Sequence, residues 1–243
     1  MSTLIYAHRG ASGDAPENTL EAFELAVKAG ADGVELDVRI CRSGEIVVAH
    51  DETVDRVSDG TGRIRDMTLS ELKNLHFNRT HPEYKDARLP LLSEVFGLLR
   101  PTGLGINIEL KNSIFDYPDL ERRVLEEAGR DFSLDRILFS SFNHHSMLRM
   151  KQLAPSVPCG LLYDGVFVRP WEYARSLGVE AIHPHYSEVV MPGGECAFAH
   201  EAGIRVNTWT VNTPEAIAAV LREDADILIT NYPAQALKMA ARG

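Results

Sequence analysis

Hydrophobic and polar residues alternate along two short segments of the chain, 33–39 and 105–111. Neighbouring side chains of a β-strand point to opposite sides, so each segment has one apolar side and one polar side. The polar side of the first segment carries Glu35 and Asp37, and that of the second carries Glu109 and Lys111. Buried carboxylates require a nearby positive charge, so the pattern predicts a cation or a cluster of basic side chains beside these strands.

Elsewhere, apolar segments of strand length alternate with amphipathic segments of helix length. The predicted strands are 4–7, 33–39, 46–51, 105–111, 136–140, 159–163, 180–184, 204–210 and 226–230; the predicted helices are 18–29, 69–75, 118–129, 143–153, 170–177, 193–202 and 213–223, with another beginning near Leu91 and a last one after the final strand. The segment 46–51 follows its predecessor too closely for a parallel crossover, so it should form a hairpin. The remaining eight strands, each followed by a helix, predict a (β/α)8 TIM barrel. A doubly wound open sheet is less favoured, because no Gly-x-Gly-x-x-Gly motif follows the first strand.

The hairpin brings a histidine toward the acidic strands. A two-residue loop at Ser43-Gly44 predicts a pairing in which His50 lies opposite Asp37 and on the same side of the sheet. A three-residue loop would shift the register by one residue and turn His50 away, unless a bulge compensated.

The whole chain is predicted to form one domain, residues 1–243, with an insertion at about 51–92. This segment is long for a loop and rich in Asp, Gly, Arg and Thr, so we expect a lid or rim and not core. Thr68 and Glu71 predict a capping box at its helix, and Asn18 with Glu21 predicts another at the first helix.

Composition excludes several classes of partner. The formal net charge is −10 and there is no run of Lys or Arg, so neither a nucleic acid nor stable association with an anionic membrane is expected. The cysteines, Cys41, Cys159 and Cys196, are odd in number and widely spaced, which is typical of a reducing compartment. The first strand begins by about Leu4, which leaves no room for a signal peptide, and no apolar run is long enough to span a bilayer. We therefore expect a cytoplasmic protein.

Three carboxylates on rigid strands, Glu35, Asp37 and Glu109, suit a divalent cation with hard oxygen ligands, Mg²⁺ or Ca²⁺. The alternative is a network of ion pairs that fills a polar barrel interior. Further polar residues follow other strands, where a TIM barrel gathers its active site. They are His8-Arg9, Ser140-Ser141, His183, Asn207, Trp209 and Thr230-Asn231. Trp209 is either an aromatic wall for a ligand or a core residue.

A metal site together with two histidines, an arginine and a lysine is suited to attack on a phosphate ester. Positive charge neutralises the non-bridging oxygens, one imidazole takes a proton from the nucleophile, and the other gives one to the leaving alkoxide. Water could attack phosphorus directly, or a neighbouring hydroxyl of the substrate could attack first to give a cyclic phosphate; proximity favours the second route.

The sequence resembles the glycerophosphodiester phosphodiesterase family, cytoplasmic bacterial type, along nearly its whole length. The resemblance rests on His8-Arg9-Gly10, Pro16-Glu17-Asn18-Thr19, Glu35-Leu36-Asp37-Val38, His50-Asp51, Ile108-Glu109-Leu110-Lys111, Ser140-Ser141-Phe142, Thr210-Val211-Asn212 and Thr230-Asn231-Tyr232-Pro233. It implies a barrel enzyme that hydrolyses a small-molecule glycerophosphodiester to glycerol 3-phosphate and an alcohol.

The resemblance also implies roles for single residues. Glu35, Asp37 and Glu109 would bind one divalent ion, His8 and His50 would form the acid-base pair, and Arg9 and Lys111 would contact phosphate, with Trp209 matching an aromatic of the family. The sequence does not assign which histidine is the acid and which the base, and it does not choose between Mg²⁺ and Ca²⁺. It also leaves open which alcohol is released and the oligomeric state.

Two other functions are compatible with these residues. A phospholipase D-like enzyme or lyase acting on a lipid diester would need an exposed apolar rim, whereas the insertion is polar and has Phe77 and Tyr84 as its aromatics. A non-catalytic barrel that binds a phosphodiester would not need both histidines, and both are present.

Overall fold

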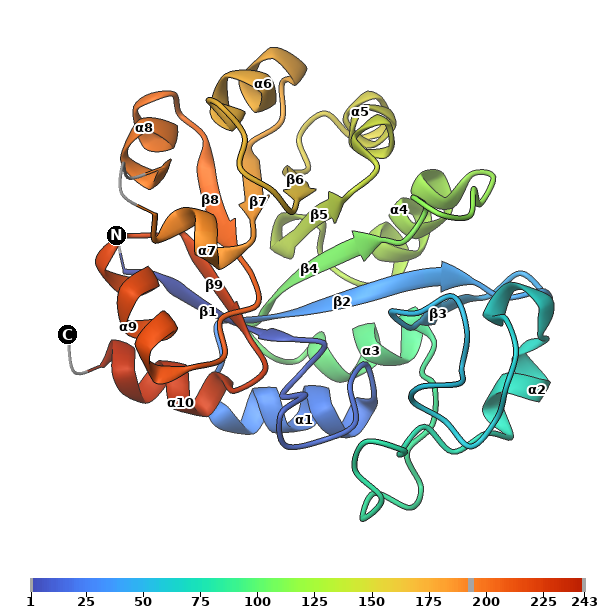
Figure 1. The fold of residues 1–243 in the computed structure, drawn as a ribbon. Helices are drawn as coiled ribbons and strands as arrows, with labels where there is room; N and C mark the ends of the chain where they lie inside the picture. The colour runs from blue at the N-terminus through green and yellow to red at the C-terminus, as the bar shows by residue number, and fades with distance from the viewer. Residues whose placement is uncertain (1, 192–194, 242–243) are drawn as a thin grey trace.

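The computed structural model describes residues 2–191 and 195–241, and its centre is a closed barrel of parallel strands (Figure 1). The barrel strands are β1 (Leu4–His8), β2 (Gly33–Ile40), β4 (Gly105–Leu110), β5 (Ile137–Ser141), β6 (Cys159–Tyr163), β7 (Ala181–Pro184), β8 (Arg205–Thr208) and β9 (Ile227–Thr230). They pair in that order, and β1 pairs with both β9 and β2, which closes the sheet. This is the predicted (β/α)8 TIM barrel.

Helices cover the outside of the barrel. They are α1 (Leu20–Ala29), α3 (Leu92–Leu99), α4 (Leu120–Asp131), α5 (His144–Leu153), α6 (Pro170–Leu177), α8 (Glu195–Glu201), α9 (Pro214–Arg222) and α10 (Pro233–Ala240). The apolar side of each strand faces them, so that Val34, Leu36, Ile106 and Ile108 are fully buried in the main core. A short helix that the sequence pattern did not predict, α7 (Tyr186–Val189), follows β7.

Tyr6 fills the interior of the barrel near its N-terminal end, where it packs with Leu138, Ile227 and Ile229. Glycines make room for its ring: a Cβ at Gly33 would lie 2.4 Å from the Tyr6 ring, and one at Gly105 would lie 2.3 Å from its hydroxyl. These side chains fill the N-terminal end of the barrel, and polar residues occupy its C-terminal end.

The segment between β3 (Ile46–Val48) and α3 lies beside the barrel, at the right of Figure 1. It contains the 3₁₀ helix η1 (Ile64–Asp66) and α2 (Leu69–Lys73), and its apolar side chains form a separate small cluster that includes Val54, Ile64 and Leu72. The predicted capping box of Thr68 and Glu71 is present at α2. Within residues 2–191 and 195–241, no helix has the length and apolar character needed to cross a membrane.

The predicted hairpin exists, but its predicted register is wrong. Ile40 pairs with Ile46 and Val38 with Val48, and the N–H of Cys41 donates to the carbonyl of Glu45 at 3.1 Å. The loop between Cys41 and Glu45 therefore has three residues, with Gly44 at φ 103°. A positive φ at the last loop position is typical of such three-residue loops. Ala49, not His50, consequently lies opposite Asp37 and donates its N–H to the Asp37 carbonyl at 2.9 Å. His50 still reaches the barrel mouth because β3 ends at Val48 and the chain turns there.

The predicted cap of the first helix is also wrong by one residue. Thr19, not Asn18, caps α1 by accepting from the N–H of Ala22. Asn18 adopts the left-handed conformation at φ 57°, and its side chain points into the barrel. The hydrogen bond from Asn18 to Asp37 of β2 has replaced the predicted cap of Asn18 on α1.

Candidate active site

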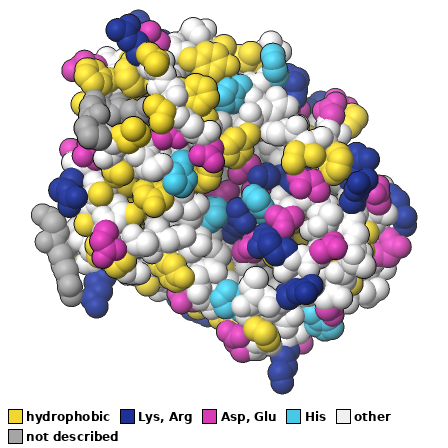
Figure 2. Space-filling view, viewed as in Figure 1, with side chains coloured by type: hydrophobic (Ala, Val, Ile, Leu, Met, Phe, Trp, Pro, Cys, Tyr) yellow, Lys and Arg dark blue, Asp and Glu magenta, His cyan; other side chains and the backbone are white. Residues whose placement is uncertain are grey.

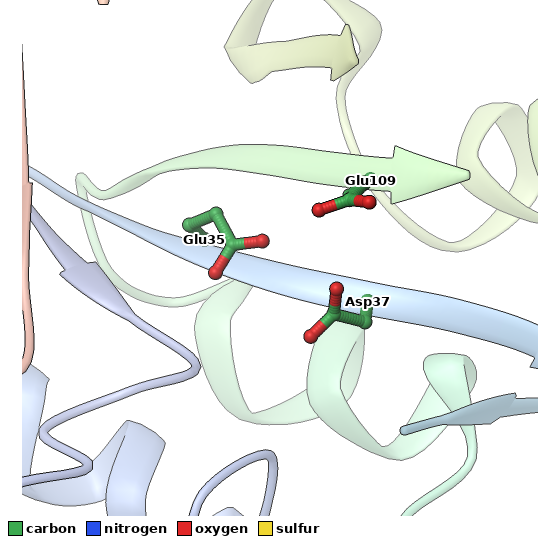
Figure 3. Close-up of side chains that lie close together, drawn as sticks. All are labelled: Glu35, Asp37 and Glu109. Carbon is green, nitrogen blue, oxygen red and sulfur yellow. The ribbon is translucent and has the colours of Figure 1, made fainter. Parts of the chain in front are cut away.

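Three buried carboxylates meet at the C-terminal end of the barrel (Figure 3). Glu35 and Asp37 come from β2 and Glu109 from β4, and Asp37 and Glu109 are direct neighbours in the strand register. One oxygen from each lies within 4.8 Å of the others. The alternation of each strand therefore places these side chains on one polar side, as the sequence predicted, and the pairing of β2 with β4 brings them together.

The three carboxyl groups differ in electrostatic environment. Burial, together with the charges of Asp37 and Glu109, raises the pKa of Glu35 well above its ordinary value, and burial likewise raises the pKa of Glu109. Burial alone would also raise the pKa of Asp37, but Arg9, His50 and Lys111 hold it below its ordinary value. The site thus concentrates negative charge that the protein's own cations only partly neutralise.

The donor set fits a divalent cation. Among the described residues, Oδ1 of Asp37 is a buried oxygen without a hydrogen-bond partner, although the residue is fully enclosed. This oxygen lies 3.8 Å from Nζ of Lys111, which offsets its charge but leaves its hydrogen-bonding capacity unused. Glu35, Asp37 and Glu109 could therefore hold an ion that prefers oxygen ligands.

Two basic side chains lie against the carboxylates. Nε of Arg9 is 3.4 Å from Oδ2 of Asp37, and the backbone N–H of Arg9 donates to Glu35 at 3.0 Å. Nζ of Lys111 donates to Glu109 at 2.7 Å and lies 3.8 Å from Asp37. Both cations are thus placed where an anionic ligand at the carboxylate cluster would meet them.

The two predicted histidines lie on the same cleft but are held differently. Nδ1 of His8 is 2.7 Å from the side-chain oxygen of Asn231, and its Nε2 lies 3.9 Å from Glu35. Burial, and then the nearby Arg9 guanidinium, lower the pKa of His8 to about 3, so its ring is neutral at neutral pH. Nδ1 of His50 is 2.6 Å from Oδ1 of Asp51.

A small cleft of about 40 Å³ joins these groups. His8, Arg9, Glu35, His50, Glu109 and Trp209 line it, together with Asn107, Ser140, Phe142, Leu162 and Ile229. Trp209 forms part of its wall, since its indole N–H donates to the carbonyl of His183 at 2.8 Å and its ring meets Phe142 edge to face. His183 and Asn207, which the pattern also placed at strand ends, instead bond to each other at 2.8 Å in the buried interior.

Residues behind the cleft form a network that the sequence pattern did not reveal. Arg56, from the segment after β3, donates to both Asp51 and Glu17 at 2.7 Å. Asp51 holds His50, and Glu17 accepts from Arg9 at 2.8 Å. Glu17 and Asp51 belong to two of the motifs that carry the family resemblance, whereas Arg56 belongs to none of them. Arg56 lies 39 residues after Glu17 in the chain, so no local pattern indicates the contact between the two.

Comparison with known proteins identifies relatives along the whole chain. The model of the glycerophosphoryl diester phosphodiesterase family matches residues 8–235. A glycerophosphodiester phosphodiesterase from Caldanaerobacter subterraneus is 36% identical over the full length of both chains, and one from Bacillus altitudinis is 35% identical over 98% of each.

Solved structures agree with these relatives. An Oleispira antarctica phosphodiesterase in complex with the product sn-glycerol-3-phosphate superposes with a TM-score of 0.89 at 29% identity, covering 100% of this chain and 98% of that one. A glycerophosphodiester phosphodiesterase from Thermotoga maritima superposes with a TM-score of 0.81 at 31% identity, covering 98% and 99%. With the family's match extending over almost every described element, this chain belongs to the glycerophosphoryl diester phosphodiesterase family.

Proposed function

We propose that this phosphodiesterase hydrolyses glycerophosphodiesters to glycerol 3-phosphate and an alcohol, using one divalent cation and the histidines His8 and His50. Family membership and the product bound to the Oleispira antarctica relative support the substrate class. The observation that carries the proposal is that three buried carboxylates, two basic side chains and two imidazoles lie on or directly beside one cleft.

Glu35, Asp37 and Glu109 are the proposed ligands of the cation. When bound, a divalent ion would polarise the phosphoryl oxygens and offset the charge that develops on them. Mg²⁺ and Ca²⁺ both suit carboxylate ligands. Arg9 and Lys111, which lie against the same carboxylates, would hold the remaining non-bridging oxygens of the substrate.

His8 and His50 are the proposed proton-transfer groups. His8 is neutral because it is buried, whereas His50 has a carboxylate, Asp51, on its Nδ1. Acid-base catalysis by a pair requires one ring to accept a proton while the other donates one, and both rings line the cleft. Each partner contributes on the order of a hundred- to ten-thousandfold in typical enzymes.

The nucleophile is either water or a free hydroxyl of the glycerol. We favour the hydroxyl, because it is already attached to the substrate beside phosphorus. Its attack therefore avoids the translational and rotational entropy that a separate water molecule would lose. This route gives a cyclic phosphate that water then opens. Supplying that cyclic phosphate tests the route: it should be hydrolysed by the enzyme, and an enzyme that neither forms nor hydrolyses it uses water directly.

Two further assignments accompany the proposal. The segment predicted as an insertion at about 51–92 supplies Asp51 and Arg56 to the network behind the cleft, so we place it in the same domain as the barrel. Trp209 and Phe142 form an apolar part of the cleft wall, where they would face the alcohol group of the diester.

The deciding experiment is a panel of glycerophosphodiesters with choline, ethanolamine, glycerol or inositol as the alcohol. The enzyme is first treated with a chelator and then supplied with one metal ion at a time, and glycerol 3-phosphate is measured. We expect turnover that the chelator abolishes and Mg²⁺ or Ca²⁺ restores. Binding of the diesters without product, at any metal concentration, would instead indicate the non-catalytic barrel.

A further inference from the structure

Arg39 follows Glu35 and Asp37 on the polar side of β2, because side chains two residues apart along a strand point to the same side. It is 1% exposed, although charged side chains are rarely buried unless they are paired. Figure 2 shows charged and histidine side chains gathering at the middle and right of one face of the molecule, but Arg39 contributes almost nothing to that surface. A guanidinium so deeply buried is not placed to meet a ligand from solvent, so its partners within the chain indicate its role.

The guanidinium of Arg39 is bound to the backbone of His50. Its Nε donates to the carbonyl oxygen of His50 at 3.1 Å, and its Nη2 donates to the same oxygen. This carbonyl lies past the end of β3 at Val48, where strand pairing no longer supplies a donor. A backbone carbonyl outside a sheet still requires a hydrogen-bond partner, and here one planar side chain provides two N–H groups.

Glu52 neutralises the charge of Arg39. Nη2 of Arg39 also donates to Oε1 of Glu52 at 2.7 Å. Burial alone would raise the pKa of the Glu52 carboxyl, but the Arg39 guanidinium lowers it, so both groups are charged at neutral pH. The backbone carbonyl of Glu52 accepts from the N–H of Ile64 in η1 at 2.9 Å. Arg39 thus connects β2 both to His50 and to the segment that follows β3.

Three contacts fix His50 beside the cleft. The N–H of Ala49 donates to the carbonyl of Asp37, which fixes the backbone before His50. The carboxylate of Asp51 bonds to Nδ1 of the imidazole, which fixes the ring. Arg39 fixes the backbone after the ring. Since Arg39 and Asp37 belong to one strand, the backbone of His50 is held on both sides by the strand that carries two of the proposed metal ligands.

We propose that Arg39 is a positioning residue for the reaction: by holding the carbonyl of His50, it fixes the position of the His50 imidazole relative to Glu35 and Asp37. The inference rests on the proposed function, because Arg39 would act through the proton-transfer role of His50. A displacement of about 1 Å in a catalytic group can lower a rate on the order of a hundredfold. Lysine is a poor substitute, since its ammonium is a single point charge and cannot reproduce the planar pair of N–H groups.

Two variants of Arg39 measure the effect on glycerophosphocholine turnover. Arg39→Met removes the guanidinium and should lower kcat by about tenfold or more while changing KM by less than about twofold, because His50 is not a substrate-binding group in the proposal. Arg39→Lys keeps a charge beside Glu52 but loses the paired N–H groups, so kcat should fall at least about threefold. It replaces Arg39→Met in every comparison if the latter does not fold. A native kcat in either variant would overturn the inference.

Arg136 provides the matched control, because its guanidinium also holds backbone carbonyls but lies away from the cleft. Its Nε donates to the carbonyl of Leu104 at 3.0 Å and its Nη2 to the carbonyl of Leu99 at 3.1 Å, next to the N-terminal end of β5. Arg136→Met should lower the melting temperature but change kcat by less than about twofold. Equal falls in kcat for Arg39→Met and Arg136→Met would show a general loss of stability and would overturn the inference.

Nuclear magnetic resonance detects a displaced ring without turnover. In chelator-treated enzyme, the imidazole signals of His50, assigned by their loss in His50→Ala, should shift in Arg39→Met and stay unchanged in Arg136→Met. Unchanged signals in Arg39→Met would contradict the inference, because the surroundings of the ring would then not depend on Arg39.

Combining Arg39→Met with His50→Ala separates positioning from other effects on kcat. If Arg39 acts through His50, its loss should change kcat by less than about twofold once the imidazole has been removed. Additive losses would overturn the inference and leave the proposed function intact. Normal turnover of the single variant His50→Ala would instead remove the proton-transfer role of His50 and, with it, the role of Arg39.

Discussion

The side-chain amide of Asn18 donates to Oδ2 of Asp37 across 2.9 Å, joining the loop before α1 to the middle of β2. Asn18 is 3% exposed and Asp37 is fully buried. A hydrogen bond to a buried charge is among the stronger ones in proteins. Asn18 therefore orients the carboxylate that the neighbouring cations keep ionised.

Asn18 is not a proposed ligand of the ion, but replacing it should weaken metal binding through Asp37. Asn18→Ala removes the amide, so Asp37 loses one partner and the divalent-ion requirement should rise by about tenfold. The measurement is metal titration of activity together with calorimetric metal binding. Ala also tolerates the left-handed conformation poorly, so Asn18→Gly is the matched control for backbone strain. An unchanged titration in both variants would contradict the orienting role.

The proposed acid-base pair gives a sharp prediction. His8→Ala and His50→Ala should each lower kcat by on the order of a hundred- to ten-thousandfold, because proton transfer at one end of the reaction is lost. Divalent-ion affinity and the melting temperature should change little, which separates catalysis from binding and folding. Near-normal turnover in either variant would remove that histidine from the mechanism.

Loss of a proposed ligand should act through the metal. Glu109→Gln keeps the size of the side chain but removes its charge, so half-maximal activity should require at least about tenfold more Mg²⁺ or Ca²⁺. Glu126→Gln, an exposed glutamate paired with Arg122 on α4, serves as the control. If both variants titrate like the native enzyme, Glu109 does not ligate the ion.

Arg56 should matter although it touches neither the ion nor the substrate in the proposal. It binds Asp51 and Glu17, the carboxylates that hold His50 and Arg9, so Arg56→Gln should lower kcat about tenfold while changing KM less. Arg56→Lys should recover part of the loss. Arg42→Gln removes a comparable exposed ion pair, Arg42 with Glu71 at 3.0 Å, and should have no effect on kcat. Equal kinetics for Arg56→Gln and Arg42→Gln would make Arg56 merely a surface residue.

The buried His183 should make the protein sensitive to acid. Burial, and then Arg205, lower its pKa from 6.5 to about 3 in the folded protein. The unfolded chain therefore binds the proton first, so this residue contributes stability that is complete above about pH 6.5 and is lost as the pH falls toward 3. In that window the free energy of unfolding should fall by up to about 1.4 kcal/mol per pH unit more than in His183→Gln. Denaturant titrations at several pH values measure this difference, with His81→Gln, at a half-buried histidine, as the control. Parallel profiles for the native protein and His183→Gln would refute the prediction.

Local sequence determined the strands, their buried sides and most helices of this protein. Alternation placed Glu35, Asp37 and Glu109 on polar strand sides, because side chains of a strand point to opposite sides whatever surrounds it. Strand number and the helix after each strand were sufficient to predict the barrel, since parallel strands need such crossovers. The eight residues predicted for the site, His8, Arg9, Glu35, Asp37, His50, Glu109, Lys111 and Trp209, lie on or directly beside one cleft.

Tertiary structure decided the features for which the local sequence pattern predicts one arrangement and a residue far away in the chain favours another. Asn18 could have capped α1, but Asp37 takes its amide and Thr19 caps instead. The hairpin register depended on a three-residue loop with Gly44 at positive φ, which the pattern of apolar residues does not specify. The ion pairs of Arg56 join residues far apart in the chain. Their positions follow from packing, because only the closed barrel brings their elements together.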